Sequence, residues 1–263
     1  IELCVKGNAF NAASNMVIDN LFIGYTGSHG IGAGTTKNLT VRNCEIGWIG
    51  GSIQNYYGID PNYPQGRRGS VTRYGNGVEI YGGCGKFVVD NCYIYQIYDA
   101  GITNQNQENI SDASRSMHNV AFTNNLIEHC EMSIEYYLGA QYKPTEGYMR
   151  NVLYEGNIMR FAGMGWGSQR GSSWGAHLKS WWMHYNQAYN FVIRNNIFDR
   201  SRANLINVVA DKAEWLPTME GTTYVHYLDA EGGRIGQPWG DYPFNKDFPA
   251  AVEQALGEKD IQI

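Results

Sequence analysis

Short runs of alternating hydrophobic and polar residues recur along most of the chain, and each run meets a turn that carries a polar residue. Alternation with a period of two is typical of a β-strand that buries one face. Each copy therefore predicts two short strands joined by a sharp turn. The six copies are Met16–Ile23, Leu39–Ile46, Phe87–Ile94, Val120–Ile127, Val152–Met159 and Phe191–Phe198.

Asparagine recurs at the turn when the copies are aligned. Asn accepts the left-handed backbone conformation that a sharp turn needs, and its amide can bond to the turn above or below. The first column holds Asn20, Asn43, Asn91, Asn124, Gly156 and Asn195. The next column holds Leu21, Cys44, Cys92, Asn125, Asn157 and Asn196. Stacked amides form ladders, so the repeat predicts an all-β solenoid, a right-handed parallel β-helix.

A third strand is predicted after the turn that follows several of these copies. These strands are His29–Gly32, Gly77–Ile80, Gly101–Asn104 and Met132–Tyr136. Because successive side chains of a strand point to opposite faces, one set should enter the core and the other should face outward. The inward set is Ile31, Val78, Ile102 and Ile134. The outward set, expected in one column, is Gly32, Glu79, Thr103 and Glu135.

Residues beyond those needed for one coil must leave the solenoid as loops, and such insertions often gather on a binding face. The predicted loops are Ile53–Tyr74, Gln105–Met117, Gln141–Met149 and Ser168–Asn186. They give the predicted solenoid one face with uneven walls.

The repeat stops after Val209, so residues 1–209 are predicted to form the β-helix. Residues 210–263 are predicted to cap its open end rather than to form an independent domain. A short helix is expected in this tail, with Asp247 as its N-cap and Pro249 in its first turn. At the other end, the alternation of Ile1–Val5 indicates that the sequence begins inside the fold.

Composition agrees with a turn-rich β protein, since there are 32 Gly and 13% aromatic residues. A net charge of −5 gives no basic stripe for nucleic acid. No apolar run approaches the roughly 18 residues of a membrane span. The five cysteines lack CxxC spacing, so they predict small buried residues in the stack rather than a zinc site.

The Asn turns, irregular coil lengths and outward loops resemble the pectin-lyase-like superfamily of right-handed β-helices over residues 1–209. The resemblance implies a secreted or extracellular protein, in the periplasm or at the cell surface as alternatives, that acts on polysaccharides. Motifs of the marked subfamilies are absent: there is no Asp-Asp pair typical of polygalacturonases, and Asp60-Pro61-Asn62 does not match the epimerase motif. The resemblance therefore does not select one activity.

Paired carboxylates are the first candidate chemistry. Adjacent coils stack about 4.8 Å apart, so the backbones of Glu79 and Glu135, two coils apart, should lie about 9.5 Å apart. Glycoside hydrolysis uses an acid and a base or nucleophile at roughly such separations. Thr103 lies between them and could bind a sugar hydroxyl, and Asp99 could raise a neighbour's pKa. The competing interpretation is ordinary outward-facing charge in solvent.

The segment from Trp166 to His184 is the second candidate, because tryptophan stacks on sugars and cationic side chains bind carboxylates. Its predicted substrate-binding residues are Trp166, Arg170, His177 and Lys179, together with Tyr136 from the third strand. In a lyase, Lys179 or Tyr136 would be the base and Arg170 or His177 the neutraliser. Calcium held by Asp60, Asp99 or Asp112 is the alternative neutraliser. Packing against the solenoid is the competing interpretation.

The first hypothesis is a glycoside hydrolase without a cofactor, with Glu79, Glu135 and Asp99 as catalytic residues. The second is a lyase that cleaves a uronic-acid polymer by β-elimination. The third is a non-catalytic β-helix, an adhesin or tailspike-like module, against which the uneven loops count. We expect a monomer that binds a polysaccharide or oligosaccharide and has neither a nucleic-acid partner nor a membrane span.

Overall fold

A computed structural model describes residues 8–52, 75–106, 116–138, 148–169, 175–180, 186–202, 204–208, 210 and 212–225. This part of the chain is all-β, with the short 3-10 helices η2 (Gly165–Gln169) and η3 (Ala213–Trp215) and no α-helix. All of its strand pairings are parallel. The predicted fold class therefore agrees with the observed structure at the level of parallel β-sheets.

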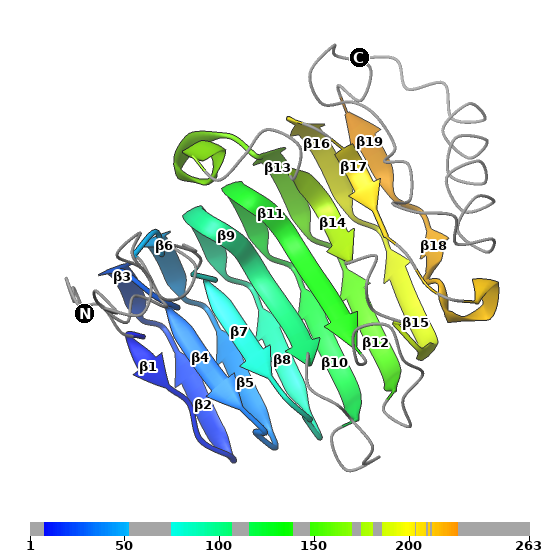
Figure 1. Ribbon diagram of the computed structural model, residues 1–263, viewed down its shortest axis with the longest axis horizontal. Helices are drawn as coiled ribbons and strands as arrows, with labels where there is room; N and C mark the ends of the chain where they lie inside the picture. Colours follow the sequence, from blue (N-terminus) through cyan, green and yellow to red (C-terminus); the bar gives the residue numbers. More distant parts are fainter. Residues whose placement is uncertain are drawn as a thin grey trace, which may run out of the picture.

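The strands form a seven-stranded and a twelve-stranded sheet (Figure 1). The smaller sheet, which we call the first face, contains β2 (Met16–Asp19), β5 (Leu39–Arg42), β8 (Phe87–Asp90), β10 (Met117–Thr123), β12 (Met149–Glu155), β15 (Ala188–Arg194) and β18 (Thr218–Glu220). The larger sheet has two parts, because the long strands β9 (Tyr93–Asn106) and β11 (Leu126–Leu138) pair with different partners along their lengths.

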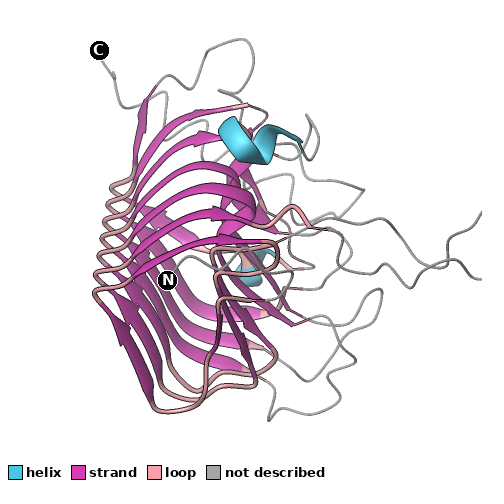
Figure 2. Cartoon of the chain, turned by 90° about the vertical axis from the view of Figure 1, so that its left-hand side faces the viewer, coloured by secondary structure: helices cyan, strands magenta, loops and turns pink. Residues whose placement is uncertain are grey.

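The second face contains the first parts of β9 and β11 with β3 (Phe22–Thr26), β6 (Glu45–Ile49), β13 (Ile158–Ala162), β16 (Ile197–Ser201) and β19 (Thr223–Val225). The third face contains their last parts with β1 (Phe10–Asn11), β4 (Ile31–Gly34), β7 (Val78–Tyr81), β14 (Ala176–Ser180) and β17 (Asn204–Asn207). Successive groups of strands, here called rungs, stack with their turns above one another along one edge (Figure 2). The arrangement is compatible with a β-helix solenoid.

The predicted Asn turns are confirmed. Asn20, Asn43, Asn91, Asn124 and Asn195 have φ between 51° and 57°, and Gly156 has φ 68° at the same place. In the next column Asn125 Nδ2 donates to Asn157 Oδ1, and Asn157 Nδ2 donates to Asn196 Oδ1, both at 2.9 Å. These three residues are at most 1% exposed. The inner amides thus form a buried ladder that links three rungs.

The end of the second face carries a further left-handed column that was not predicted. It holds Tyr25, Trp48, Gln96, His129, Phe161 and Arg200, with φ from 46° to 58°. All six side chains end in a planar group, and the rings of His129 and Phe161 stack at 5.0 Å. The left-handed conformation is expected for Gly and Asn. The Tyr, Trp, Gln, His, Phe and Arg residues of this column therefore give no turn signal in the sequence.

The hydrophobic core lies between the three faces. Ile31, Val78, Ile102 and Ile134 are all 0% exposed, which confirms the predicted inward set. Cys44, Cys84, Cys92 and Cys130 are buried and free, as expected of small residues in the stack. Cys4 lies outside the described residues.

Two predicted boundaries differ from the structure. The predicted loop Ser168–Asn186 contains strand β14, whose five residues are all buried. The strand was not predicted because its sequence includes the polar residues His177 and Lys179. Strands β18 and β19 pair with β15 and β16, so both sheets continue past Val209. Their turn has Gly221, with φ 56°, in place of Asn, which makes this seventh copy hard to detect. The central residues of the other three predicted loops and the expected helix at Asp247 lie outside the described residues.

Candidate functional site

The predicted outward column is confirmed on the third face. Gly32 pairs with Glu79, Glu79 with Thr103, and Thr103 with Glu135. The column continues to Lys179 and Asn207. Because each step is one strand spacing, the backbones of Glu79 and Glu135 lie about 9.5 Å apart. The roles assigned to these residues remain predictions.

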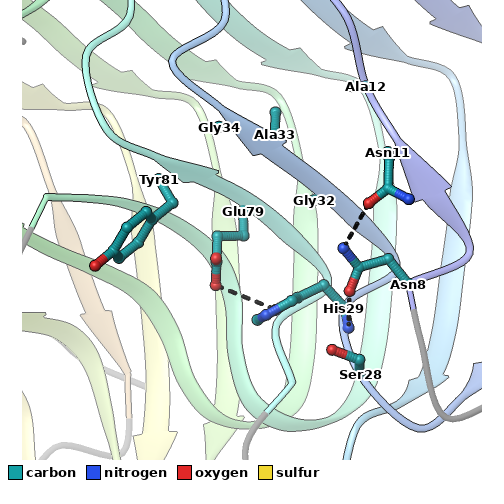
Figure 3. A pocket seen from close by; sticks show the side chains of 10 residues that line it. All are labelled: Asn8, Asn11, Ala12, Ser28, His29, Gly32, Ala33, Gly34, Glu79 and Tyr81. Atoms are coloured by element: carbon teal, nitrogen blue, oxygen red, sulfur yellow. Dashed lines mark hydrogen bonds and ion pairs between the residues drawn. The ribbon is translucent and has the colours of Figure 1, made fainter. Parts of the chain in front are cut away.

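Glu79 lines a pocket of about 380 Å³ (Figure 3). Its polar lining is Asn8, Asn11, Ser28, His29, Glu79 and Tyr81. Gly32 and Gly34 lie on β4 beside Glu79 and Tyr81 of β7; the Asn8 side chain occupies the space that a Cβ at Gly32 would take, whereas the space at Gly34 is open. Asn8 Oδ1 accepts the backbone N–H of His29 at 3.2 Å, and Asn8 Nδ2 donates to Asn11 Oδ1 at 2.9 Å. The pocket is therefore polar and hydrogen-bonded along one wall.

Three nitrogen atoms surround one oxygen of Glu79. Asn76 Nδ2 donates to Glu79 Oε2 at 2.5 Å, Gln105 Nε2 donates to it at 3.3 Å, and His29 Nδ1 lies 3.1 Å away. Burial raises the pKa of Glu79 to about 7, against the opposing effect of the Asn76 bond. Near neutral pH a large fraction of Glu79 is therefore protonated, as a general acid needs.

His29 is the partner that sequence reasoning missed. Burial lowers its pKa to about 4, so the imidazole is neutral near pH 7. The backbone N–H of Asn76 donates to His29 Nδ1 at 3.0 Å, which assigns the ring proton to Nε2. Nδ1 is then an acceptor facing the carboxyl group of Glu79. The sequence feature that could have identified His29 is its position directly before a third-face strand, one rung from Glu79.

Hydrogen bonds connect Glu79 to Glu135. Gln105 Nε2 donates to Glu79 Oε2 and also to Thr103 Oγ1, the latter at 3.0 Å. Thr103 Oγ1 donates to Glu135 Oε2 at 3.4 Å, and Tyr137 Oη donates to Gln105 Oε1. Thr103 is 0% exposed and holds Glu135, so its predicted contact with a sugar hydroxyl is wrong for this conformation.

The other two predicted carboxylates lie deeper than Glu79. Glu135 is 4% and Asp99 5% exposed, and neither lines the pocket. The backbone N–H of Asp99 donates to Gly75 O at 3.3 Å, and the next residue, Ala100, donates its N–H to Asn76 Oδ1 at 2.9 Å. Asn76 thus joins the backbone beside Asp99 to the carboxyl group of Glu79.

Tyr136 and His177 were predicted to bind substrate, and the structure contradicts both. Tyr136 is 1% exposed, and its ring packs edge to face on Phe191 at 5.0 Å. His177 is 0% exposed, and its ring nitrogens lie 3.1 Å from Ser133 Oγ and 3.2 Å from Asp199 O. Alternation turns Tyr136 inward with Ile134, whereas His177 alternates with the core residue Leu178 and is covered on the other side of β14.

Lys179 lies in the outward column beside Glu135, as a strand residue that is 3% exposed. Trp166 lies in η2, where its ring packs on Tyr98 at 5.8 Å and its backbone N–H donates to Gln96 Oε1 at 2.7 Å. Its contact with a substrate stays a prediction. Arg170 lies outside the described residues.

Glu131 is a buried acid that the sequence did not single out. It is 0% exposed, and neither carboxyl oxygen has a hydrogen-bond partner in the described part of the chain. Burial raises its pKa to about 8, while the charges of Arg202 and Lys179 act in the opposite direction. The folded protein therefore binds a proton here more tightly than the unfolded chain does.

Replacing Glu131 by glutamine is expected to raise the free energy of unfolding above about pH 8. As pH rises from about 4.5, unfolded Glu131 ionises while folded Glu131 keeps its proton, so wild-type stability falls until the folded pKa is passed. Melting temperatures from about pH 5 to about pH 9 should diverge upward for Glu131→Gln. Glu128→Gln is the control: bonds from Tyr93 and Arg160 outweigh burial and lower the pKa of Glu128, so this variant should be less stable at neutral pH. Equal melting curves for Glu131→Gln and wild type at every pH would contradict the assignment.

Within the described ranges no group of three His, Cys, Asp or Glu side chains is placed to hold a metal ion. Asp60 and Asp112, two of the calcium ligands considered above, lie outside those ranges. No helix of the described residues has the length and apolar character to cross a membrane.

A scan against family models, a search of curated proteins and a search of solved structures each found no match for this chain. The case for a function therefore comes from the geometry of the third face.

Proposed function

We propose that this protein is a secreted glycoside hydrolase built on a right-handed β-helix of the pectin-lyase-like kind, with Glu79 as its general acid. One observation carries the proposal: Glu79 lines a polar pocket, and its burial raises its pKa to about 7. A carboxyl group that keeps its proton near neutral pH can protonate the oxygen of a glycosidic bond. The expected substrate is a polysaccharide or oligosaccharide.

Glu135 supplies the second carboxyl group in this proposal. Its backbone is about 9.5 Å from that of Glu79, and side chains that lean together bring the carboxyl groups into the range of about 6.5–9.5 Å that inverting enzymes use. Glu79 donates its proton to the leaving oxygen as the bond to the anomeric carbon breaks. Water adds to that carbon from the opposite side, and its proton passes to Glu135. Asp99 is the third carboxyl group of the proposal, and the residue after it, Ala100, donates its backbone N–H to Asn76, which bonds to Glu79.

A polysaccharide panel tests the proposal, with products measured in parallel by a reducing-sugar assay and by the absorbance of unsaturated uronides. New reducing ends without unsaturated products are the expected result. Reducing ends accompanied by unsaturated products would identify a lyase. No product on any polymer of the panel would favour the non-catalytic β-helix.

The pH dependence of the reaction is expected to follow Glu79. Because the reaction needs its proton, kcat/KM should fall about tenfold for each pH unit above the pKa of about 7. Rates measured on the cleaved polymer at constant ionic strength would check this. An unchanged kcat/KM up to about pH 9 would exclude Glu79 as the acid.

A lyase is the second candidate, and His29 favours it. In this candidate, His29 Nδ1, 3.1 Å from Glu79, exchanges the hydrogen bond from the Asn76 N–H for the proton that β-elimination removes beside a uronic-acid carboxylate. Protonated Glu79 would donate a hydrogen bond to that carboxylate, and Tyr81 lines the same pocket as a proton donor for the leaving oxygen. His29→Asn should then abolish formation of unsaturated products.

A further inference from the structure

Cys44 and Cys92 occupy the same position on adjacent rungs. The backbone N–H of Tyr93 donates to Cys44 O at 2.9 Å, and the next residues, Glu45 and Tyr93, are paired in register. Each cysteine is 2% exposed, and each thiol donates to the carbonyl oxygen two residues before it, Cys44 to Arg42 O at 3.1 Å and Cys92 to Asp90 O at 3.3 Å. Three later rungs hold asparagine at this position, so a thiol pair replaces the amide ladder here.

The geometry of adjacent parallel strands brings such a pair near disulfide distance. Neighbouring strands are about 4.8 Å apart, and the Cα atoms of disulfide-bonded cysteines lie about 4.4–6.8 Å apart. Both side chains point to the same side of the sheet, so a small approach of the two Sγ atoms suffices. We propose that Cys44 and Cys92 are a disulfide-forming pair, oxidised by a small-molecule disulfide such as oxidised glutathione.

The reaction balances as two exchange steps. The Cys44 thiolate attacks one sulfur of the oxidant, which forms a mixed disulfide and releases one thiolate. The Cys92 thiolate then attacks the Cys44 sulfur, which forms the Cys44–Cys92 bond and releases the second thiolate. The two protein thiol protons end on the two released thiols. The neighbouring Cys92 side chain lowers the pKa of Cys44, whereas the Cys44 side chain and burial raise the pKa of Cys92, so Cys44 is the expected first nucleophile.

The bond would join two rungs that meet at the candidate site. Cys44 and Glu79 belong to one rung. Cys92, Thr103 and Gln105 belong to the rung after it. A disulfide would close the intervening chain into one loop and lower the entropy of the unfolded state. The inference does not depend on the proposed activity, because it rests on the register of the turn alone.

The other described cysteines provide internal controls. Cys130 pairs with Ile97 on the rung before it, and Cys84 forms its bridge with Met117. Neither therefore has a cysteine at the paired position, and both should remain thiols under conditions that oxidise the Cys44–Cys92 pair.

The test is to refold the full chain with oxidised and reduced glutathione, block remaining thiols with an alkylating reagent, digest without reduction and map the peptides by mass spectrometry. The expected result is one peptide pair joined through Cys44 and Cys92, alkylated Cys84 and Cys130, and a melting temperature several degrees above that of the reduced protein. Cys44→Ala and Cys92→Ala should each abolish the linked pair. Alkylation of both cysteines, or linkage of either to a different cysteine, would overturn the proposal.

Discussion

Replacing Glu79 by glutamine is expected to lower kcat/KM on the cleaved polysaccharide by about 10²- to 10⁴-fold, the usual contribution of a general acid. Glutamine has nearly the same shape but cannot transfer a proton to the leaving oxygen. The loss should be largest on substrates with poor leaving groups, because those depend most on protonation. Rates for wild type and Glu79→Gln on the natural polymer and on an activated aryl glycoside would measure both effects.

Glu45→Gln provides the matched control for this experiment. Glu45 is an exposed glutamate on the second face, where it accepts a hydrogen bond from Tyr95 Oη at 2.9 Å. Its replacement should leave kcat/KM within about twofold of wild type. Full activity of a folded Glu79→Gln protein would remove this residue from the mechanism.

Replacing Asn157 by alanine is expected to lower the free energy of unfolding by about 4 kcal/mol, the second large effect. Asn157 Nδ2 donates to Phe122 O at 2.8 Å, and Asn157 Oδ1 accepts the backbone N–H and Nδ2 of Asn125 at 3.1 Å and 2.9 Å. Alanine removes these bonds and leaves the buried backbone N–H of Asn125 without this partner, while Asn125 Nδ2 keeps its bond to Val89 O; an unsatisfied buried group costs about 1–3 kcal/mol. Urea unfolding of the two proteins measures the difference.

Asn151→Ala is the comparison for Asn157. Asn151 is exposed, has φ 56° and donates its Nδ2 to Asn119 Oδ1 at 3.1 Å. Its replacement removes this bond and the one that Asn151 Oδ1 accepts from Asn190 Nδ2 at 2.9 Å, both exposed, and places alanine in the left-handed region, at about 1–2 kcal/mol. If both variants lost the same stability, the turn conformation rather than the buried ladder would hold the rungs together.

The sequence allowed the outward column to be predicted because two simple rules determine it. Alternation assigns Glu79 and Glu135 to the outer side of a strand, and the repeated Asn turn aligns the rungs. Parallel pairing in register then places Thr103 between them. Local patterns therefore carried long-range information, as they do in repeat structures.

The same rules could not predict which side chains are buried or which side chains of neighbouring rungs come into contact. His29 acts on Glu79 through a contact between residues 50 positions apart (79 − 29), and no motif marks it. His177 and Lys179 look like loop residues by composition, yet their strand buries both. Glu131 sits where β9 and β11 shift register, and a register shift has no clear sequence signature.

Carboxylates in the outward column can be separated only by whole multiples of the rung spacing of about 4.8 Å, measured between their backbones. Glu79 and Glu135 are two rungs apart, with Thr103 on the rung between them. A carboxylate at position 103 would instead lie about 4.8 Å from Glu79 along the stack, close to the separation of about 5–5.5 Å at which glycosidases retain configuration. Under the proposed hydrolase mechanism, the single substitution Thr103→Glu would bring a carboxyl pair to the spacing of retaining glycosidases.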